Sequence, residues 1–232
     1  MAVTESESDG KGTGEGTDSD CWKQGEYQII RSEEIICNRK ERDMSEVYDH
    51  CPVFENGRYL LRFAAREDAK DLALVYGDKN ALPFFNSDNC HGDNFYYPNE
   101  ERMAETIAFW HSSYASKWFV RWTIVDKQIR KAIGSIELFH RTAADEFNDA
   151  GVLRLDVGSE YETEECLAAV TGMILPDAFD FFDCEEIITK VPIYAVERIK
   201  AVQKIGFEKT DRLLIGTADG YAYKDYWFIR RP

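Results

Sequence analysis

From Gly57 onward, short strand-like runs alternate with helical patterns, and this alternation constrains the fold more than any other feature of the sequence. Strands cluster in the middle of the chain and the last part follows a β-α-β-α-β-β order, so we expect a mixed α+β fold with helices on both faces of one sheet. The expected strands are 59–63, 118–125, 132–139, 152–157 and 187–191, the expected helices are 67–76, 100–114, 164–182 and 195–204, and the runs 213–215 and 223–229 are expected to pair as a hairpin around Asp219-Gly220.

Three residues are expected to mark where helices begin or end. Asn99 has the side chain of a helix cap and precedes the helix over 100–114. Pro176 is expected to kink or end its helix, because proline lacks an amide hydrogen. Gly206 is expected to stop the last helix in the left-handed conformation.

The first 56 residues lack this regularity. Residues 1–20 contain four Gly and six acidic residues, a composition that predicts a flexible acidic tail. Residues 21–56 are an N-terminal extension with a strand-like step at 27–30 and an apolar step at 35–37. Whether this extension adds a strand to the sheet or forms a dimer contact is open. Residues 57–232 are predicted to form one domain.

Charge and cysteine usage limit the partners and the location that we expect. The chain carries 43 acidic against 28 basic residues, a formal charge of −15, which repels nucleic acid and anionic membranes and weakly favours amines. The six cysteines are scattered without a CxxC pair or a secretory signal, and the four histidines show no HxH or HExxH spacing. We therefore expect a reduced, cytoplasmic protein without a metal site.

Several short strings carry a resemblance to a known family. They are Arg58-Tyr59-Leu60-Leu61-Arg62 with Glu67-Asp68-Ala69, Trp122-Thr123-Ile124 with Ile133-Gly134-Ser135-Ile136, and Lys204-Ile205-Gly206-Phe207. In order and spacing they resemble the GNAT superfamily of N-acetyltransferases, in particular the branch of ribosomal-protein N-terminal acetyltransferases. The resemblance implies a mostly antiparallel sheet splayed at one strand pair, acetyl-CoA as the donor, and direct transfer to an amine without a covalent enzyme intermediate.

The resemblance also implies where the coenzyme binds. The strand that contains Leu155 and Val157 offers backbone groups to the pantetheine arm, with a bulge at Gly158, and the next turn binds the pyrophosphate through its amides. That turn is rich in glycine in the family, whereas this chain has four carboxylates and no glycine over 159–165. The implied coenzyme residues are Leu155, Val157, Gly158, Tyr161, Thr163, Glu164, Glu165 and Arg198.

The helix over 195–204 departs from the family as well. Members often have an asparagine that bonds the pantetheine and many have a tyrosine that protonates the leaving thiolate, but this chain has Ala195 and Val202 at those places. Arg198 replaces a small residue, and it either approaches a coenzyme phosphate or is a solvated helix charge. Thr163 is expected to cap the preceding helix.

Acetyl transfer to an ammonium group needs a base, and two carboxylates on the central strands are candidates. Glu137 alternates with the apolar residues Ile133 and Phe139 on its strand, and Asp156 alternates with Arg154 along the next strand. The alternative, weighed equally, is an ion pair of Arg154 with Glu137 or with Asp156.

An aromatic-rich loop over 80–97 falls where the family has its acceptor wall. Phe84, Phe85, Tyr96 and Tyr97 are the expected substrate residues, and Asp88 and Asp93 are expected to attract a cation. Alternatively, these rings only cover the edge of the sheet.

The predicted function is transfer of an acetyl group from acetyl-CoA to a primary amine, on a small molecule or a peptide N-terminus, by a cytoplasmic protein that is either a monomer or a homodimer. The alternative is a GNAT-fold binding or regulatory module that has lost coenzyme A binding. The first predicts an open cleft at the amides after Tyr161, and the second predicts a cleft filled by side chains.

Overall fold

The computed structural model describes residues 46–232. The acidic tail at 1–20 and the strand-like steps predicted at 27–30 and 35–37 lie outside these residues. The extension enters the described part as a short helix, α1 (Glu46–Asp49), followed by an edge strand, β1 (Phe54–Glu55), which pairs with β2 (Tyr59–Phe63).

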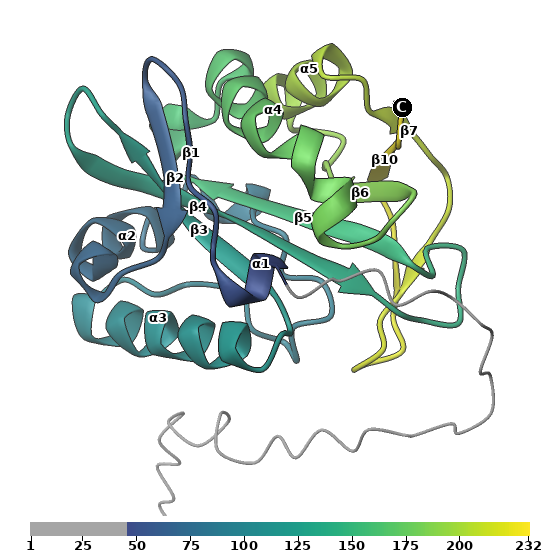
Figure 1. Cartoon of the computed structure of the whole chain (residues 1–232), viewed down its shortest axis with the longest axis horizontal. Helices are drawn as coiled ribbons and strands as arrows, with labels where there is room; N and C mark the ends of the chain where they lie inside the picture. The colour runs from purple at the N-terminus through teal and green to yellow at the C-terminus, as the bar shows by residue number, and fades with distance from the viewer. Residues whose placement is uncertain (1–45) are drawn as a thin grey trace, which may run out of the picture. The chain divides into compact units, whose positions relative to one another are not determined.

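One eight-stranded sheet organises the described residues (Figure 1). Its order is β1, β2, β3 (Val120–Asp126), β4 (Lys131–Arg141), β5 (Ala150–Val157), β6 (Glu186–Lys190), β10 (Tyr226–Arg230) and β7 (Glu208–Lys209). All pairs are antiparallel except β5 with β6. The expected mostly antiparallel, mixed α+β sheet is confirmed.

The helices divide between the two faces of this sheet, as Figure 1 shows. One face carries α2 (Ala69–Tyr76) and α3 (Glu100–Ala115), and the other carries α4 (Glu164–Phe181) and α5 (Val196–Lys204). Short 3-10 turns lie at Arg66–Asp68, Leu82–Phe84 and Ser159–Tyr161. Because strand side chains alternate between faces, β5 presents Leu153 and Leu155 to the α4 side and Arg154 and Asp156 to the α2 side.

The expected helix signals at Asn99 and Gly206 are confirmed. The Asn99 side chain accepts a hydrogen bond from the amide of Arg102, and Gly206 has a φ of +96°. Pro176 does not end its helix, because α4 continues to Phe181. Proline costs an internal helix about 3 kcal/mol, and burial of the apolar face of α4 in the core offsets that loss.

The predicted C-terminal hairpin is wrong for the run 223–229, most of which does not pair with the run 213–215. Only β8 (Leu214–Ile215) and β9 (Ala222–Tyr223) pair around the turn at Gly220. The residues after them form β10, which lies between β6 and β7 in the main sheet. The reason is burial: Tyr226 and Trp227 become almost fully buried there, which a two-stranded ribbon does not provide.

Candidate functional site

The two parallel strands of the sheet separate partway along their length. Pairing of β5 with β6 runs only from Gly151 to Leu153, whereas β5 stays paired with β4 as far as Val157. Beyond Leu153, one edge of β5 therefore has no neighbouring strand. The splay expected from the resemblance is confirmed, and its backbone groups need other partners. The expected bulge at Gly158 is absent, since its amide bonds Ile133 and the pairing of β4 with β5 runs unbroken up to it.

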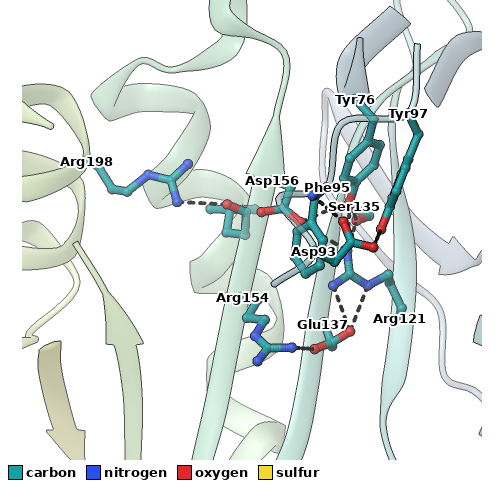
Figure 2. A network of polar contacts seen from close by, with 11 residues as sticks. Tyr76, Asp93, Phe95, Tyr97, Arg121, Ser135, Glu137, Arg154, Asp156 and Arg198 are labelled. Atoms are coloured by element: carbon teal, nitrogen blue, oxygen red, sulfur yellow. Dashed lines mark hydrogen bonds and ion pairs between the residues drawn. The ribbon is translucent and has the colours of Figure 1, made fainter. Parts of the chain in front are cut away.

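The splay is filled by a side chain from α5. Arg198 is only 3% exposed, and its Nη1 donates to the carbonyl oxygen of Leu155 at 2.8 Å. Figure 2 shows Arg198 reaching across to β5. The alternative of a solvated helix charge at Arg198 is therefore wrong.

Arg198 also forms a two-point ion pair with the turn after β5. Its Nε and Nη2 donate to the two carboxylate oxygens of Glu162, each at 2.7 Å. Both side chains are nearly buried. Such a paired fork is the strongest hydrogen-bonded arrangement that an arginine makes, and it holds the turn against α5.

The backbone amides of that turn are already engaged. Tyr161 donates to the carbonyl of Gly158, Glu162 to that of Ser159, and Thr163 to that of Tyr161. The amide of Ser159 donates to the Asp78 carboxylate at 2.9 Å. The chain thus satisfies within itself the donors that a glycine-rich turn leaves for a pyrophosphate.

Backbone amides in the first turn of α4 also have hydrogen-bond partners within the chain. Thr163 caps the helix, as predicted, by accepting from the amide of Cys166 at 3.3 Å. The amide of Glu164 donates to a carboxylate oxygen of Glu197 from α5 at 3.2 Å. A carboxylate of the chain itself therefore lies on the positive end of the helix, where an anion is favoured.

A cleft of about 600 Å³ surrounds this helix end. Its charged lining residues are the acids Glu160, Glu164, Glu165 and Glu197 and the bases Arg58 and Lys204. The acids outnumber the bases, so an anionic ligand is repelled unless the carboxylates move. The expected coenzyme residues Tyr161, Thr163, Glu164 and Glu165 all line this cleft, whereas Leu155, Val157 and Gly158 are buried.

On the opposite face of the sheet, a buried polar network joins five residues of β3, β4 and β5 to α2 (Figure 2). Arg121 of β3 forms ion pairs with Glu137 at 2.7 Å and with Asp156 at 3.0 Å. Glu137 also pairs with Arg154 at 2.9 Å. The hydroxyl of Tyr76 donates to Asp156 at 3.0 Å. The expected ion pair of Arg154 is confirmed with Glu137.

The two catalytic candidates differ within this network. Both oxygens of Glu137 accept hydrogen bonds from arginines. Asp156 accepts through Oδ2, while its Oδ1 is buried and has no hydrogen-bond partner among the described residues. Burial raises the pKa of Asp156 above its ordinary value, against the opposing influence of Arg121. Of the two carboxyls, Asp156 is the one with an oxygen that has no hydrogen-bond partner among the described residues.

The sequence analysis missed two members of this network. Arg121 was not singled out, although a lone arginine inside the apolar run of β3 is the signal of a buried ion pair. Tyr76 is the last residue of the helix expected over 67–76, and its hydroxyl was given no role. Its hydroxyl in fact contacts Ser135 at 2.7 Å as well as Asp156.

The aromatic residues of the acceptor loop separate into two groups. Phe85 and Tyr97 are buried against the ring of Tyr76. Phe84 is half-buried and packs on Tyr194, and Tyr96 is half-buried as well. The loop acids are also engaged. Asp88 bonds Lys190 and Tyr226, and Asp93 accepts from the Tyr97 hydroxyl.

Residues 46–232 contain neither a metal-binding cluster nor a membrane-spanning helix. The described side chains include no group of three or more His, Cys, Asp or Glu residues placed to hold a metal ion. No helix in the described part combines the length and the apolar character needed to cross a membrane.

No family model and no curated protein matches the sequence. Solved structures do match the fold. A ribosomal-protein-S5-alanine acetyltransferase from Vibrio fischeri aligns with a TM-score of 0.56 at 17% identity, covering 76% of this chain and 94% of its own. A GNAT-family acetyltransferase from Bacillus anthracis aligns with a TM-score of 0.56 at 11% identity, covering 77% and 98%.

A spermidine N-acetyltransferase from Vibrio cholerae, solved with CoA and spermine, aligns with a TM-score of 0.53 at 13% identity. The alignment covers 75% of this chain and 96% of that one. At these identities the likeness concerns the backbone and not the site. The chain has the fold of the GNAT acetyltransferases.

Proposed function

We propose that the protein transfers an acetyl group from acetyl-CoA to a primary amine on a small molecule or a peptide N-terminus. The observation that carries this proposal is the position of Asp156. It follows Leu155, whose carbonyl lies in the splay, and its Oδ1 is a buried acceptor without a partner among the described residues. A buried carboxyl with a raised pKa, one residue along the strand from the carbonyl at the splay, has the properties of a general base.

The proposed reaction is a direct attack on the thioester. Asp156 accepts a proton from the ammonium, the amine nitrogen then bonds the acetyl carbon, and the bond between that carbon and sulfur breaks. The thiolate leaves, and the second proton of the amine nitrogen passes to it through solvent, because Val202 stands in place of an acidic side chain. Glu137 holds Arg121 and Arg154 in place around Asp156.

Donor binding requires the splay to open. The pantetheine arm needs the Leu155 carbonyl that Arg198 now occupies, and the phosphates need the amide that Glu197 occupies. If the open form is a small fraction of the population, the apparent affinity falls by that fraction. In the open form Arg198 is released from Glu162 and pairs with a coenzyme phosphate. Phe84 and Tyr96 contact the acceptor.

A second function is favoured by the same closed splay. The Arg198–Glu162 pair occupies the splay and the Glu197 carboxylate accepts from the amide of Glu164, while the cleft lined by Tyr161 and Thr163 stays open. The occupied splay favours a GNAT-fold binding or regulatory module without coenzyme, and the open cleft favours the transferase. We propose a cytoplasmic location for either function. We also propose a homodimer, in which the N-terminal extension would form the dimer contact.

Calorimetric titration of acetyl-CoA into the full chain distinguishes the two functions. Transferase function predicts saturable binding that weakens with dephospho-CoA, and turnover that falls about 10²–10⁴-fold in Asp156→Asn. Glu67→Gln, on the exposed surface, is the control. Absence of binding up to millimolar donor rules out the transferase and supports the binding module. Binding with unchanged turnover in Asp156→Asn removes Asp156 as the base.

A further inference from the structure

Tyr76, the last residue of α2, places its hydroxyl inside the polar network of the sheet (Figure 2). The residue is 0% exposed. Its ring lies within 5.2–6.1 Å of the rings of Phe85, Tyr97 and Trp110, measured between centroids. These rings hold the phenol in one position. A tyrosine that is buried so completely needs a hydrogen-bond partner for its hydroxyl.

The hydroxyl of Tyr76 joins three strands of the sheet. It donates to Oδ2 of Asp156 at 3.0 Å, lies 2.7 Å from Oγ of Ser135, and accepts from Nη1 of Arg121 at 2.7 Å. The same nitrogen of Arg121 donates to Oδ2 of Asp156 at 3.0 Å. One hydroxyl from a helix is thus fixed between a cation and the carboxyl proposed as the base.

The two oxygens of Asp156 are therefore unequal. Oδ2 accepts from the Tyr76 hydroxyl and from Arg121, whereas Oδ1 is buried without a hydrogen-bond partner among the described residues. Each carboxylate oxygen has two lone pairs, and both lone pairs of Oδ2 are in use. A proton on Oδ2 would displace one of these donors. Oδ1 is therefore the oxygen that can take a proton.

Tyr76 donates to the charged form of Asp156 without adding a charge. Its removal leaves the surrounding charges in place and takes away one donor, so the pKa of Asp156 should rise further. The charged and titratable groups around this carboxyl are Arg121 of β3, Glu137 of β4, Arg154 of β5, Arg198 of α5, and Asp93 with Tyr97 in the loop before α3.

We infer that Tyr76 is a positioning residue for acetyl transfer: its hydroxyl, with Arg121, holds Oδ2 of Asp156 and leaves Oδ1 to take the proton of the acceptor ammonium. The inference rests on the proposed function, because Asp156 is the base of that reaction. In this step one N–H bond of the ammonium breaks and one O–H bond forms at Oδ1. Tyr76 keeps its own proton and acts only through Asp156.

The test compares two variants that each remove one buried tyrosine hydroxyl. Tyr76→Phe removes the donor to Asp156. Tyr226→Phe is the matched control, because its hydroxyl is also buried and donates to the carboxylate of Asp88 at 3.1 Å. We expect Tyr76→Phe to lower kcat about tenfold or more while KM for acetyl-CoA stays within about twofold, since the base is misplaced and the donor cleft is not. Tyr226→Phe should keep the wild-type kcat.

A second readout follows the titration of Asp156 without any substrate. Carbon-13 NMR of the side-chain carboxyl reports it, and the signal is assigned by its absence in Asp156→Asn. The titration should move to higher pH in Tyr76→Phe, because a donor to the charged form is lost, and should not move in Tyr226→Phe. The acid limb of kcat/KM should move in the same direction. A mere loss of stability would move neither.

Each outcome decides for or against the role of Tyr76. A wild-type kcat or an unmoved Asp156 titration in folded Tyr76→Phe overturns the inference, as do equal losses of kcat in the two variants. If Tyr76→Phe does not fold, Ser135→Ala decides by the same two readouts. It removes the other hydroxyl that contacts Tyr76, and it should change both in the same direction by less, whereas no change overturns the inference.

Failure of the proposed function has a different signature. The NMR titration needs neither acetyl-CoA nor an acceptor. A shifted titration in Tyr76→Phe, combined with no acetyl transfer by the wild-type protein, supports the hold of Tyr76 on Asp156 and contradicts only the transferase.

Discussion

Arg198 and Glu162 form a nearly buried, two-point ion pair that joins α5 to the turn after β5, with both hydrogen bonds at 2.7 Å. The same guanidinium group bonds the carbonyl of Leu155 in the splay. One side chain therefore closes the sheet at the point where the parallel strands separate. A small residue at position 198, as the family has there, would leave the gap between β5 and α5 unfilled.

Removal of one partner of this pair is expected to be costly. Arg198→Ala leaves the Glu162 carboxylate buried without a counter-charge, so the free energy of unfolding should fall by ~3–5 kcal/mol. The double variant Arg198→Met with Glu162→Leu removes both charges and should stay within ~2 kcal/mol of wild type. Urea denaturation measures both. A small loss in Arg198→Ala would show that the pair is open to solvent.

Glu197→Gln is expected to increase the affinity for acetyl-CoA. The substitution removes a carboxylate from the amide of Glu164, where the coenzyme phosphates would bind. We expect a gain of at least fivefold at low salt that shrinks as salt is added. Calorimetry measures the affinity. The control is Glu208→Gln, which removes the same charge at an exposed position. An equal gain in affinity in both variants would show that the lower net charge, and not the freed helix end, increases acetyl-CoA binding.

Asp156 is expected to make stability fall as the pH rises. Burial raises its folded-state pKa above 3.8, so between 3.8 and that higher value the folded chain binds more protons than the unfolded chain. The free energy of unfolding should decrease with pH across this window. Asp156→Asn lacks the titrating group, so wild type should lose stability relative to it. Urea denaturation between pH 3 and 8 measures the difference, and parallel curves contradict it.

Asp68 is a control for Asp156, because its pKa is shifted in the opposite direction. Burial alone would raise its pKa, but hydrogen bonds from Arg62, the Ala65 amide and Thr123 outweigh this effect and hold the pKa below 3.8. Its stabilisation is present above 3.8 and is lost as the pH falls through the folded-state pKa. Asp68→Asn should therefore weaken the protein most at neutral pH.

Gly134→Ala is expected to disturb the strand pair beneath the site. A Cβ at this position would overlap the carbonyl oxygen of Asp156 and approach the Cα of Val157 at 2.9 Å. Overpacking of this kind costs about 1–3 kcal/mol, and here the obstacle is backbone. Gly172→Ala is the matched control, since no atom beyond the adjacent backbone of its own helix lies within 4 Å of its new methyl group.

Gly172 lies inside α4, so its substitution should stabilise the protein by ~0.5–1 kcal/mol. Thermal denaturation of the two variants should therefore shift in opposite directions. A loss in both would indicate that Gly172 is needed for close packing.

Local periodicity and capping in the sequence predicted the four main helices and the five central strands, but not the short strands β1 and β7 or the place of β10 in the sheet. The alternation along β5 placed Arg154 and Asp156 on one face, and Thr163 was identified as a cap from its position alone. The splay came from the resemblance and was confirmed by the pairing that ends at Leu153.

Only the tertiary structure decided the state of the site. Whether Arg198 is solvated or buried depends on where Glu162 and Leu155 lie in space, 36 and 43 residues away along the chain. Glu197 reaches the amide of Glu164 for the same reason. Burial and ion pairing are set by contacts between distant segments, so periodicity within one segment does not determine them.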